Sequence, residues 1–103
     1  MKSTGTDPNA AFDLPLNTAV FTTKFVVKRG DPILYISHDE EDDGWQFHNG
    51  EGGFDEKDAM VVSLKKITTL DPSVCEVADL PPGWYAERSR VGAAWIRKKS
   101  PSE

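Results

Sequence analysis

Two short β-type segments on either side of an acidic stretch constrain the fold of this chain most strongly. Residues 33–38 (ILYISH) form a nearly continuous apolar run, which is typical of a central strand covered on both faces. Residues 45–48 (WQFH) alternate apolar and polar side chains, and the Asp43-Gly44 dipeptide before them favours a tight turn. We therefore predict a β-hairpin whose two aromatic side chains on the second strand face the core.

Further strand patterns lie on both sides of this hairpin. Residues 20–28 are rich in β-branched and aromatic side chains and are followed by a Gly- and Pro-containing turn. Residues 84–88 alternate in polarity and are separated by a short polar stretch from residues 94–97, which predicts a second hairpin. Together these segments predict an antiparallel sheet of about four or five strands.

A helical segment is expected between the two hairpins, over residues 63–80. Ser63 is a suitable N-cap for a helix with an apolar stripe, and Asp71-Pro72 supplies a second N-cap followed by proline at the first helical position. The Pro-Pro-Gly sequence at 81–83 ends the segment. The expected fold class is therefore α+β, with the helical segment packed on one face of the sheet.

The length of 103 residues fits one domain with one hydrophobic core. We expect a flexible N-terminal tail over residues 1–19, a single domain over residues 20–97 and a polar tail over residues 98–103. The expected core consists of Phe25, Val27, Leu34, Ile36, Trp45, Phe47, Leu64, Ile67, Leu70, Val77, Trp84, Trp95 and Ile96.

Charge and hydropathy argue against several classes of partner. A net charge of −5 disfavours general binding to nucleic acid or to anionic membranes, both of which need clustered cations. No apolar run approaches the roughly 20 residues that span a bilayer, and the N-terminal sequence lacks a signal-peptide pattern, so the cytoplasm is the expected location. The single cysteine, Cys75, excludes an intramolecular disulfide and is interpreted as a buried structural thiol. The basic residues of the C-terminal segment (Arg88, Arg90, Arg97, Lys98 and Lys99) are interpreted as a solvated turn and tail.

The acidic stretch at residues 39–43 invites a calcium hypothesis, which its spacing does not support. Asp39, Glu41 and Asp43 match the first, third and fifth ligand positions of an EF-hand loop. The twelfth position should be a bidentate glutamate but is Gly50, and the flanking segments are predicted strands. The acidic run is interpreted as a solvated turn, and the alternative is that this turn meets a basic partner protein.

Two histidines on the predicted hairpin suggest a second hypothesis, a mixed metal site formed by His38, Asp39 and His48. A turn centred on residues 41 and 42 pairs His38 with Trp45, which separates the histidines along the ladder. Each histidine is thus expected to be hydrogen-bonded within the protein or to face solvent. A small metal-binding regulator or metal-dependent enzyme stays open as the alternative function.

One resemblance to a known family is carried by residues 32–39 (PILYISHD), 44–48 (GWQFH), 71–73 (DPS) and 80–84 (LPPGW). The chain resembles, over about residues 20–97, small bacterial proteins of the immunity protein 33 domain family, formerly domain of unknown function 2185. The resemblance implies neutralisation of a toxin by direct binding and supplies no catalytic motif. The acidic turn and the extended tail depart from the compact pattern of that family.

These observations predict a non-enzymatic protein-binding module without a cofactor, and the resemblance implies an immunity-type inhibitor of a bacterial toxin with a basic surface. The residues expected to contact the partner lie on the rim of the first hairpin: His38, Asp39, Glu40, Glu41, Asp42, Asp43 and His48.

Overall fold

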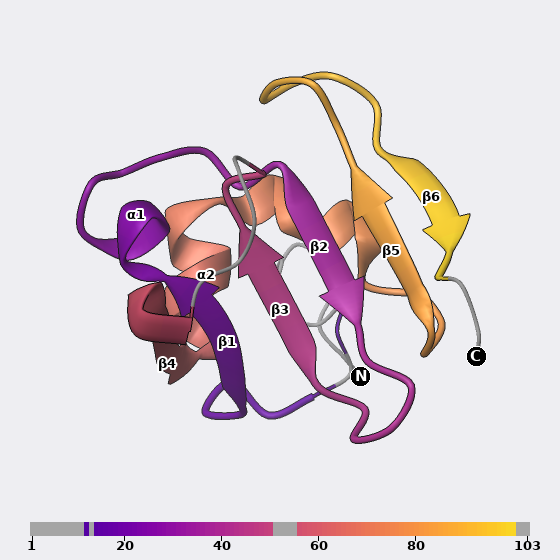
Figure 1. The fold of residues 1–103 in the computed structure, drawn as a ribbon, viewed down its shortest axis with the longest axis horizontal. Helices are drawn as coiled ribbons and strands as arrows, with labels where there is room; N and C mark the ends of the chain where they lie inside the picture. Colours follow the sequence, from indigo (N-terminus) through magenta and orange to yellow (C-terminus); the bar gives the residue numbers. More distant parts are fainter. Residues whose placement is uncertain (1–11, 13, 51–55, 101–103) are drawn as a thin grey trace, which may run out of the picture.

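A computed structural model describes residues 12, 14–50 and 56–100 of the chain. The described residues form a mixed sheet of six strands in the order β4-β1-β3-β2-β5-β6 (Figure 1). The strands are β1 (Ala19–Thr23), β2 (Tyr35–His38), β3 (Trp45–His48), β4 (Ala59–Ser63), β5 (Trp84–Glu87) and β6 (Ile96–Lys99). The helical elements are α1 (Lys24–Val27), α2 (Leu64–Leu70) and the 3₁₀ helices η2 (Glu56–Asp58) and η3 (Pro72–Val77).

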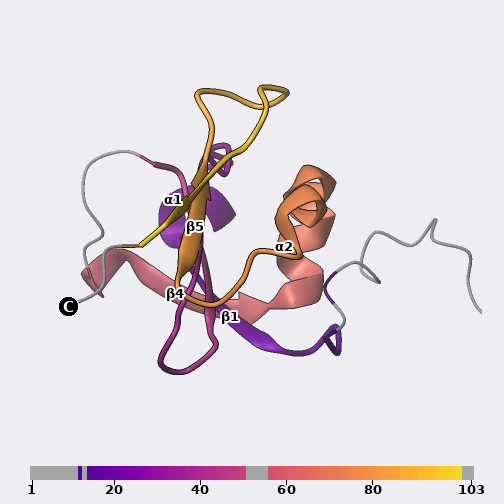
Figure 2. The ribbon, with the colours of Figure 1, turned by 90° about the vertical axis from the view of Figure 1, so that its right-hand side faces the viewer.

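The α+β class is confirmed, but the sheet is mixed and has six strands, whereas an antiparallel sheet of about four or five strands was expected. All neighbouring strands are antiparallel except β1 and β3, which run parallel with Phe21 opposite Gln46. The strands β2 and β3 occupy the middle of the sheet, as the apolar character of β2 predicted. Figure 2 shows α2 lying to one side of the sheet, in agreement with the expected single helical layer.

The first hairpin has the predicted register. His38 lies opposite Trp45 and Tyr35 lies opposite His48. Trp45 and Phe47 are buried beneath the helical layer, because alternate residues of a strand face the same side of a sheet.

The predicted strand over residues 20–28 ends early, because a short helix replaces its second half. Thr23 has extended backbone angles, and its Oγ1 accepts a hydrogen bond from Val26 N, which caps α1. The helical turn brings Val26 into the core and leaves Phe25 and Val27 only half-buried. Phe25 and Val27 were expected in the core, and that prediction was wrong, because the residue between them is the buried one.

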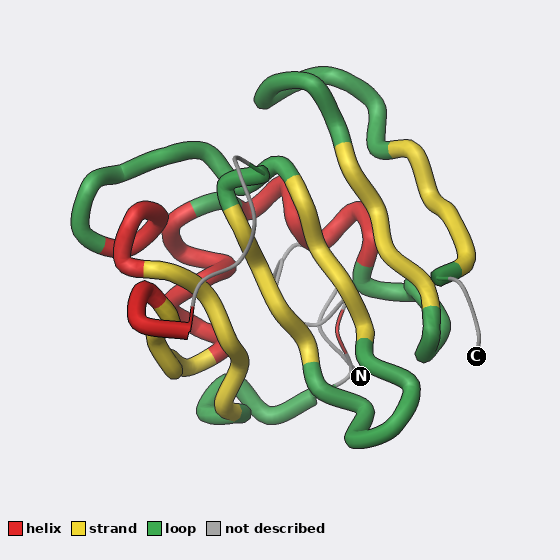
Figure 3. The backbone as a smooth tube through the Cα atoms, in the orientation of Figure 1, coloured by secondary structure: helices red, strands yellow, loops and turns green. Residues whose placement is uncertain are grey.

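The helical segment consists of two helices, each starting at the predicted cap. Ser63 Oγ accepts a hydrogen bond from Lys66 N, and Asp71 Oδ1 accepts one from Ser73 N. The free N–H groups of Leu64 and Lys65 donate to the carbonyl oxygens of Thr18 and Leu16, so the chain before β1 also caps α2. Figure 3 shows the two helices following one another across the sheet.

The core differs from the predicted list at its margins. Leu70 and Ile96 are 42% and 56% exposed, since Leu70 ends α2 and β6 is an edge strand, and Leu34, Trp84 and Trp95 are only half-buried. The predicted members Ile36, Trp45, Phe47, Leu64, Ile67 and Val77 are buried, and they are joined by Phe12, Val20, Val26, Ile33, Val74, Leu80 and Ala86.

The folded part of the chain extends beyond residues 20–97 at both ends. Phe12 is 5% exposed, and its ring meets the Trp45 ring edge-on at 5.1 Å between centroids, so the segment expected to be a tail contributes to the core. Lys98 and Lys99 belong to β6 rather than to a tail. Of the expected tails, residues 1–11, 13 and 101–103 lie outside the described residues.

Candidate functional site

The acidic turn, residues 39–43, connects β2 to β3 and is closed by backbone hydrogen bonding. Asp39 N donates to Gly44 O at 2.7 Å, directly beyond the His38–Trp45 pair of the ladder. Gly83 N donates to His38 O at 2.7 Å, so the same end of β2 is also tied to the turn that precedes β5. The end of β2 where the acidic turn begins is therefore hydrogen-bonded both to the end of the turn and to the turn that precedes β5.

Two of the five acidic side chains accept hydrogen bonds from the backbone of the acidic turn. Asp39 Oδ1 accepts from Glu41 N at 2.8 Å, and Asp42 Oδ1 accepts from Gly44 N at 2.9 Å. Asp43 adopts a positive φ of 61°, a conformation that aspartate tolerates better than most residues. Part of the acidic stretch therefore stabilises the backbone conformation of the turn.

His38 is a positioned side chain of this turn. Its ring stacks on Trp45 with 4.1 Å between centroids. Its Nδ1 lies 2.6 Å from Leu80 O and its Nε2 lies 2.8 Å from Asp43 Oδ1. A carbonyl oxygen only accepts, so Nδ1 carries a proton and donates to Leu80 O. His38 therefore anchors the acidic turn to the end of the helical layer.

His48 lies at the other end of the hairpin and on the opposite face of the sheet. It sits opposite Tyr35, and its Nε2 donates to Gln46 Oε1 at 3.0 Å. Burial lowers the pKa of His48, because a desolvated imidazole favours its neutral form. His48 is therefore separated from the acidic turn, although it was expected on the same contact rim.

The predicted metal constellation is not assembled. His38 and His48 belong to ladder pairs at opposite ends of β2 and to opposite faces, so the set of His38, Asp39 and His48 does not converge on one point. Residues 12, 14–50 and 56–100 contain no group of three or more His, Cys, Asp or Glu side chains suited to a metal ion. The geometry of the described residues thus gives no support to the metal-dependent alternative.

The remaining predicted contact residues form one exposed surface. Glu40, Glu41, Asp42 and Asp43 are exposed, and the Asp43 side chain retains 75% of its accessible surface. Asp39 is half-buried at the base of the turn. The structure therefore brings together five of the seven predicted residues as an acidic rim, with His38 behind it and His48 elsewhere.

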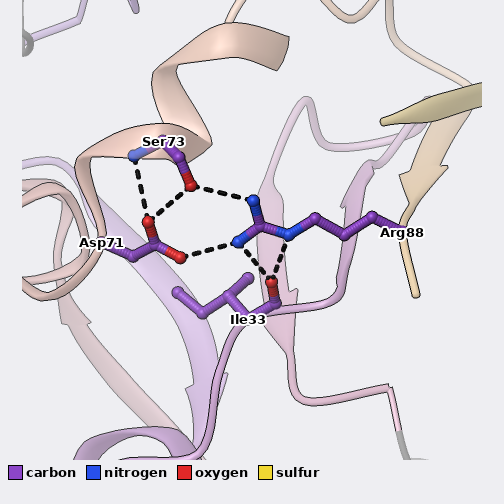
Figure 4. A network of polar contacts seen from close by, with 4 residues as sticks. All are labelled: Ile33, Asp71, Ser73 and Arg88. Atoms are coloured by element: carbon purple, nitrogen blue, oxygen red, sulfur yellow. Dashed lines mark hydrogen bonds and ion pairs between the residues drawn. The ribbon is translucent and has the colours of Figure 1, made fainter. Parts of the chain in front are cut away.

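One polar cluster that the sequence did not reveal lies between the sheet and the helical layer. Arg88 donates through Nε and Nη2 to Ile33 O, through Nη1 to Ser73 Oγ and through Nη2 to Asp71 Oδ2 (Figure 4). Its guanidinium carbon also lies 4.1 Å from the centroid of the Trp95 ring. The interpretation of Arg88 as part of a solvated basic tail was wrong, because its side chain is a buried, paired cation. This cluster ties β5 to η3 and has a structural role.

A groove on the sheet face opposite α2 was also not predicted. It has a volume of about 470 Å³ and is lined by Leu34, Tyr35, Gly50, Glu87, Arg88, Ser89 and Ile96. The Tyr35 and Tyr85 rings stack beside it with 5.3 Å between centroids. Burial raises the pKa of Tyr35, and electrostatic interactions with the neighbouring Tyr85 and Glu87 raise it further. Strand alternation could have predicted that these side chains share a face, but not that β2, β5 and β6 would be neighbours.

Within the described residues, no helix is long and apolar enough to cross a membrane. Comparison with known proteins finds no match among protein-family models, curated proteins or solved structures. The resemblance to the immunity protein 33 domain family therefore stays a prediction.

Proposed function

We propose that this protein is a non-enzymatic protein-binding module whose acidic turn binds a basic surface of a partner protein. The observation that carries this proposal is a row of exposed carboxylates, Glu40 to Asp43, on a turn whose backbone is fixed by hydrogen bonds from within the turn.

Fixing the turn before binding favours association for two reasons. A preorganised loop loses less conformational entropy when it meets its partner. Carboxylates of one sign on an exposed turn also attract an oppositely charged surface and raise the association rate, an effect that weakens as salt is added. The net charge of −5 acts in the same direction.

Inhibition of a toxin is the specific form of this proposal that the family resemblance supports. A rigid acidic hairpin inserted into the basic active site of a toxin would cover that site without any chemistry by the inhibitor. An equimolar amount of this protein is then expected to abolish the activity of the partner. The residues of the acidic turn carry the contact in this form as well.

The experiment begins with purification of the tagged protein and its bound partner from the organism that produces it, at low and at moderate salt. The affinity of the purified partner is then compared for wild type and for the double variant Glu40→Gln, Glu41→Gln. These two side chains are exposed, and the substitutions keep Asp39, Asp42 and Asp43, which hold the turn. We expect a loss of affinity of about tenfold or more, chiefly through slower association.

A matched control removes two negative charges from another surface. Glu76→Gln with Asp79→Asn gives the same net charge, and both residues are exposed on the helical layer. Affinity should fall much less in this control, because the turn is intact. If both double variants lose the same affinity, the partner responds only to net charge and does not contact the turn specifically. Unchanged affinity in the turn variant would overturn the proposal.

A further inference from the structure

The groove beside Tyr35 combines an aromatic face, a carboxylate and an apolar wall. Tyr35 of β2 lies directly opposite Glu87 of β5, which in turn lies opposite Ile96 of β6. The Ile96 side chain is exposed at this edge, and Tyr35 stacks on Tyr85. Aromatic rings and a carboxylate side by side form the usual environment for a cationic side chain.

The protein itself places a cation on the carboxylate of this groove. Lys98 Nζ donates to Glu87 Oε2 at 3.1 Å, and this contact raises the pKa of Lys98. Both side chains are about half exposed, and exposed pairs of this kind contribute little to stability. The Lys98 ammonium can therefore be exchanged for an incoming cation at small cost.

An arginine side chain suits the groove better than the resident lysine does. A guanidinium donates two parallel hydrogen bonds to a carboxylate, whereas an ammonium acts as a point charge. Its plane also stacks on an aromatic ring, and Tyr35 supplies one next to Glu87. The methylene groups of an arginine can pack on Leu34 and Ile96, which line the same groove.

We propose that this groove binds an arginine side chain of the partner protein, with the guanidinium on Glu87 and Tyr35 in place of the Lys98 ammonium. The inference rests on the proposed function in that it assigns the same basic partner a second contact. The groove and the acidic turn lie at opposite ends of β2. From Tyr35 to Asp39 the chain advances four residues, or about 13 Å at the rise of a strand.

The test is a nuclear magnetic resonance titration of the full chain with a capped glycyl-arginyl-glycine tripeptide. The control ligand replaces arginine by citrulline, which has almost the same shape and no charge. We expect saturable shifts of the Tyr35 and Tyr85 ring signals with the arginine peptide and at most about a tenth of that affinity with the citrulline peptide.

Two variants of the wild-type chain should change this affinity in opposite directions. Glu87→Gln removes the carboxylate charge and should weaken binding by about tenfold. Lys98→Gln removes the competing ammonium and should strengthen binding by about threefold. Both positions are exposed on the sheet surface, and thermal unfolding checks that each variant keeps the fold.

The proposal is overturned if the two peptides shift the tyrosine signals equally, if neither shifts them, or if Glu87→Gln leaves the affinity unchanged. The tripeptide is too short to span both the groove and the acidic turn. If the tripeptide does not bind, the proposed function therefore still stands. If the whole partner binds the turn variant with unchanged affinity, the proposed function is overturned, and the tripeptide titration alone decides whether the groove binds arginine.

Discussion

Arg88, directly after strand β5, and Asp71, the N-cap of η3, form an ion pair of 2.8 Å, with only 1% of the Arg88 side chain exposed. The same aspartate caps η3 through its other oxygen, which accepts from Ser73 N and Ser73 Oγ. A single carboxylate therefore starts a helix and neutralises the buried cation that attaches this helix to the sheet.

Replacing Asp71 by alanine should be among the most destabilising single changes in the chain. The substitution leaves a buried guanidinium without its counter-ion, which typically costs about 3–5 kcal/mol, and it also removes the cap of η3. Urea unfolding should report a correspondingly lower free energy of unfolding for Asp71→Ala. Asp71→Asn keeps an acceptor for Ser73 N, so it should lose less.

The double variant Asp71→Ala, Arg88→Met separates the effect of an unpaired buried charge on stability from the effect of lost side-chain packing. Removing both partners leaves no unpaired buried ion, so the double variant should be less destabilised than the sum of the single variants. Strict additivity in urea unfolding would mean that the two residues act independently, contrary to their contact.

The sequence could indicate the role of Asp71 in this pair but not the burial of Arg88. Asp71-Pro72 is a local signal, and it correctly predicted the helix cap. Arg88 lies 17 residues from Asp71 and 55 from Ile33, so its burial depends on how β5 packs against both. Local sequence gave the opposite indication, because Arg88 lies near other basic residues that are exposed.

The same distinction between local and distant information explains the rest of the fold. The hairpin register followed from strand alternation and the turn at residues 39–44, both of which are local. The parallel contact of β1 with β3 joins residues 25 positions apart, Phe21 and Gln46, and no local pattern indicates it. For the candidate site, the acidic turn was predictable for the same local reason, while the groove needed the neighbouring positions of β2, β5 and β6.

Phe12 provides a test of whether the chain before β1 belongs to the domain. Its ring contacts Trp45 and Phe47 edge-on, at 5.1 Å and 6.3 Å between centroids. Phe12→Ala should lower the free energy of unfolding by about 3 kcal/mol, because it deletes a buried ring and leaves a cavity. Leu16→Ala is the matched control: this side chain is 36% exposed, and the loss should stay below about 1 kcal/mol. Similar small losses for both would show that the segment is a tail after all.

His48 should make stability fall in mildly acidic solution. Its pKa is lowered by burial from the ordinary value of 6.5, so below that pH the unfolded chain takes up a proton that the folded chain does not. The contribution of His48 is therefore complete above pH 6.5 and decreases as the pH falls toward the lowered pKa, by up to about 1.4 kcal/mol per pH unit. The carboxyl pKa values of Asp31 and Asp79 are also lowered, mainly by hydrogen bonds from Arg29 and Arg97, but from 3.8. Their effect thus belongs to a more acidic range.

Urea unfolding at intervals between pH 7.5 and 5.5 isolates the histidine effect. Wild type should lose stability across this range, and His48→Gln, which cannot take up the proton, should show a clearly flatter dependence. The variant is expected to start from a lower free energy of unfolding at pH 7.5, since it changes a buried side chain, so the comparison rests on the slope. An identical slope in the variant would mean that His48 accepts its proton equally well in the folded and unfolded chains, which its burial beside Tyr35 argues against.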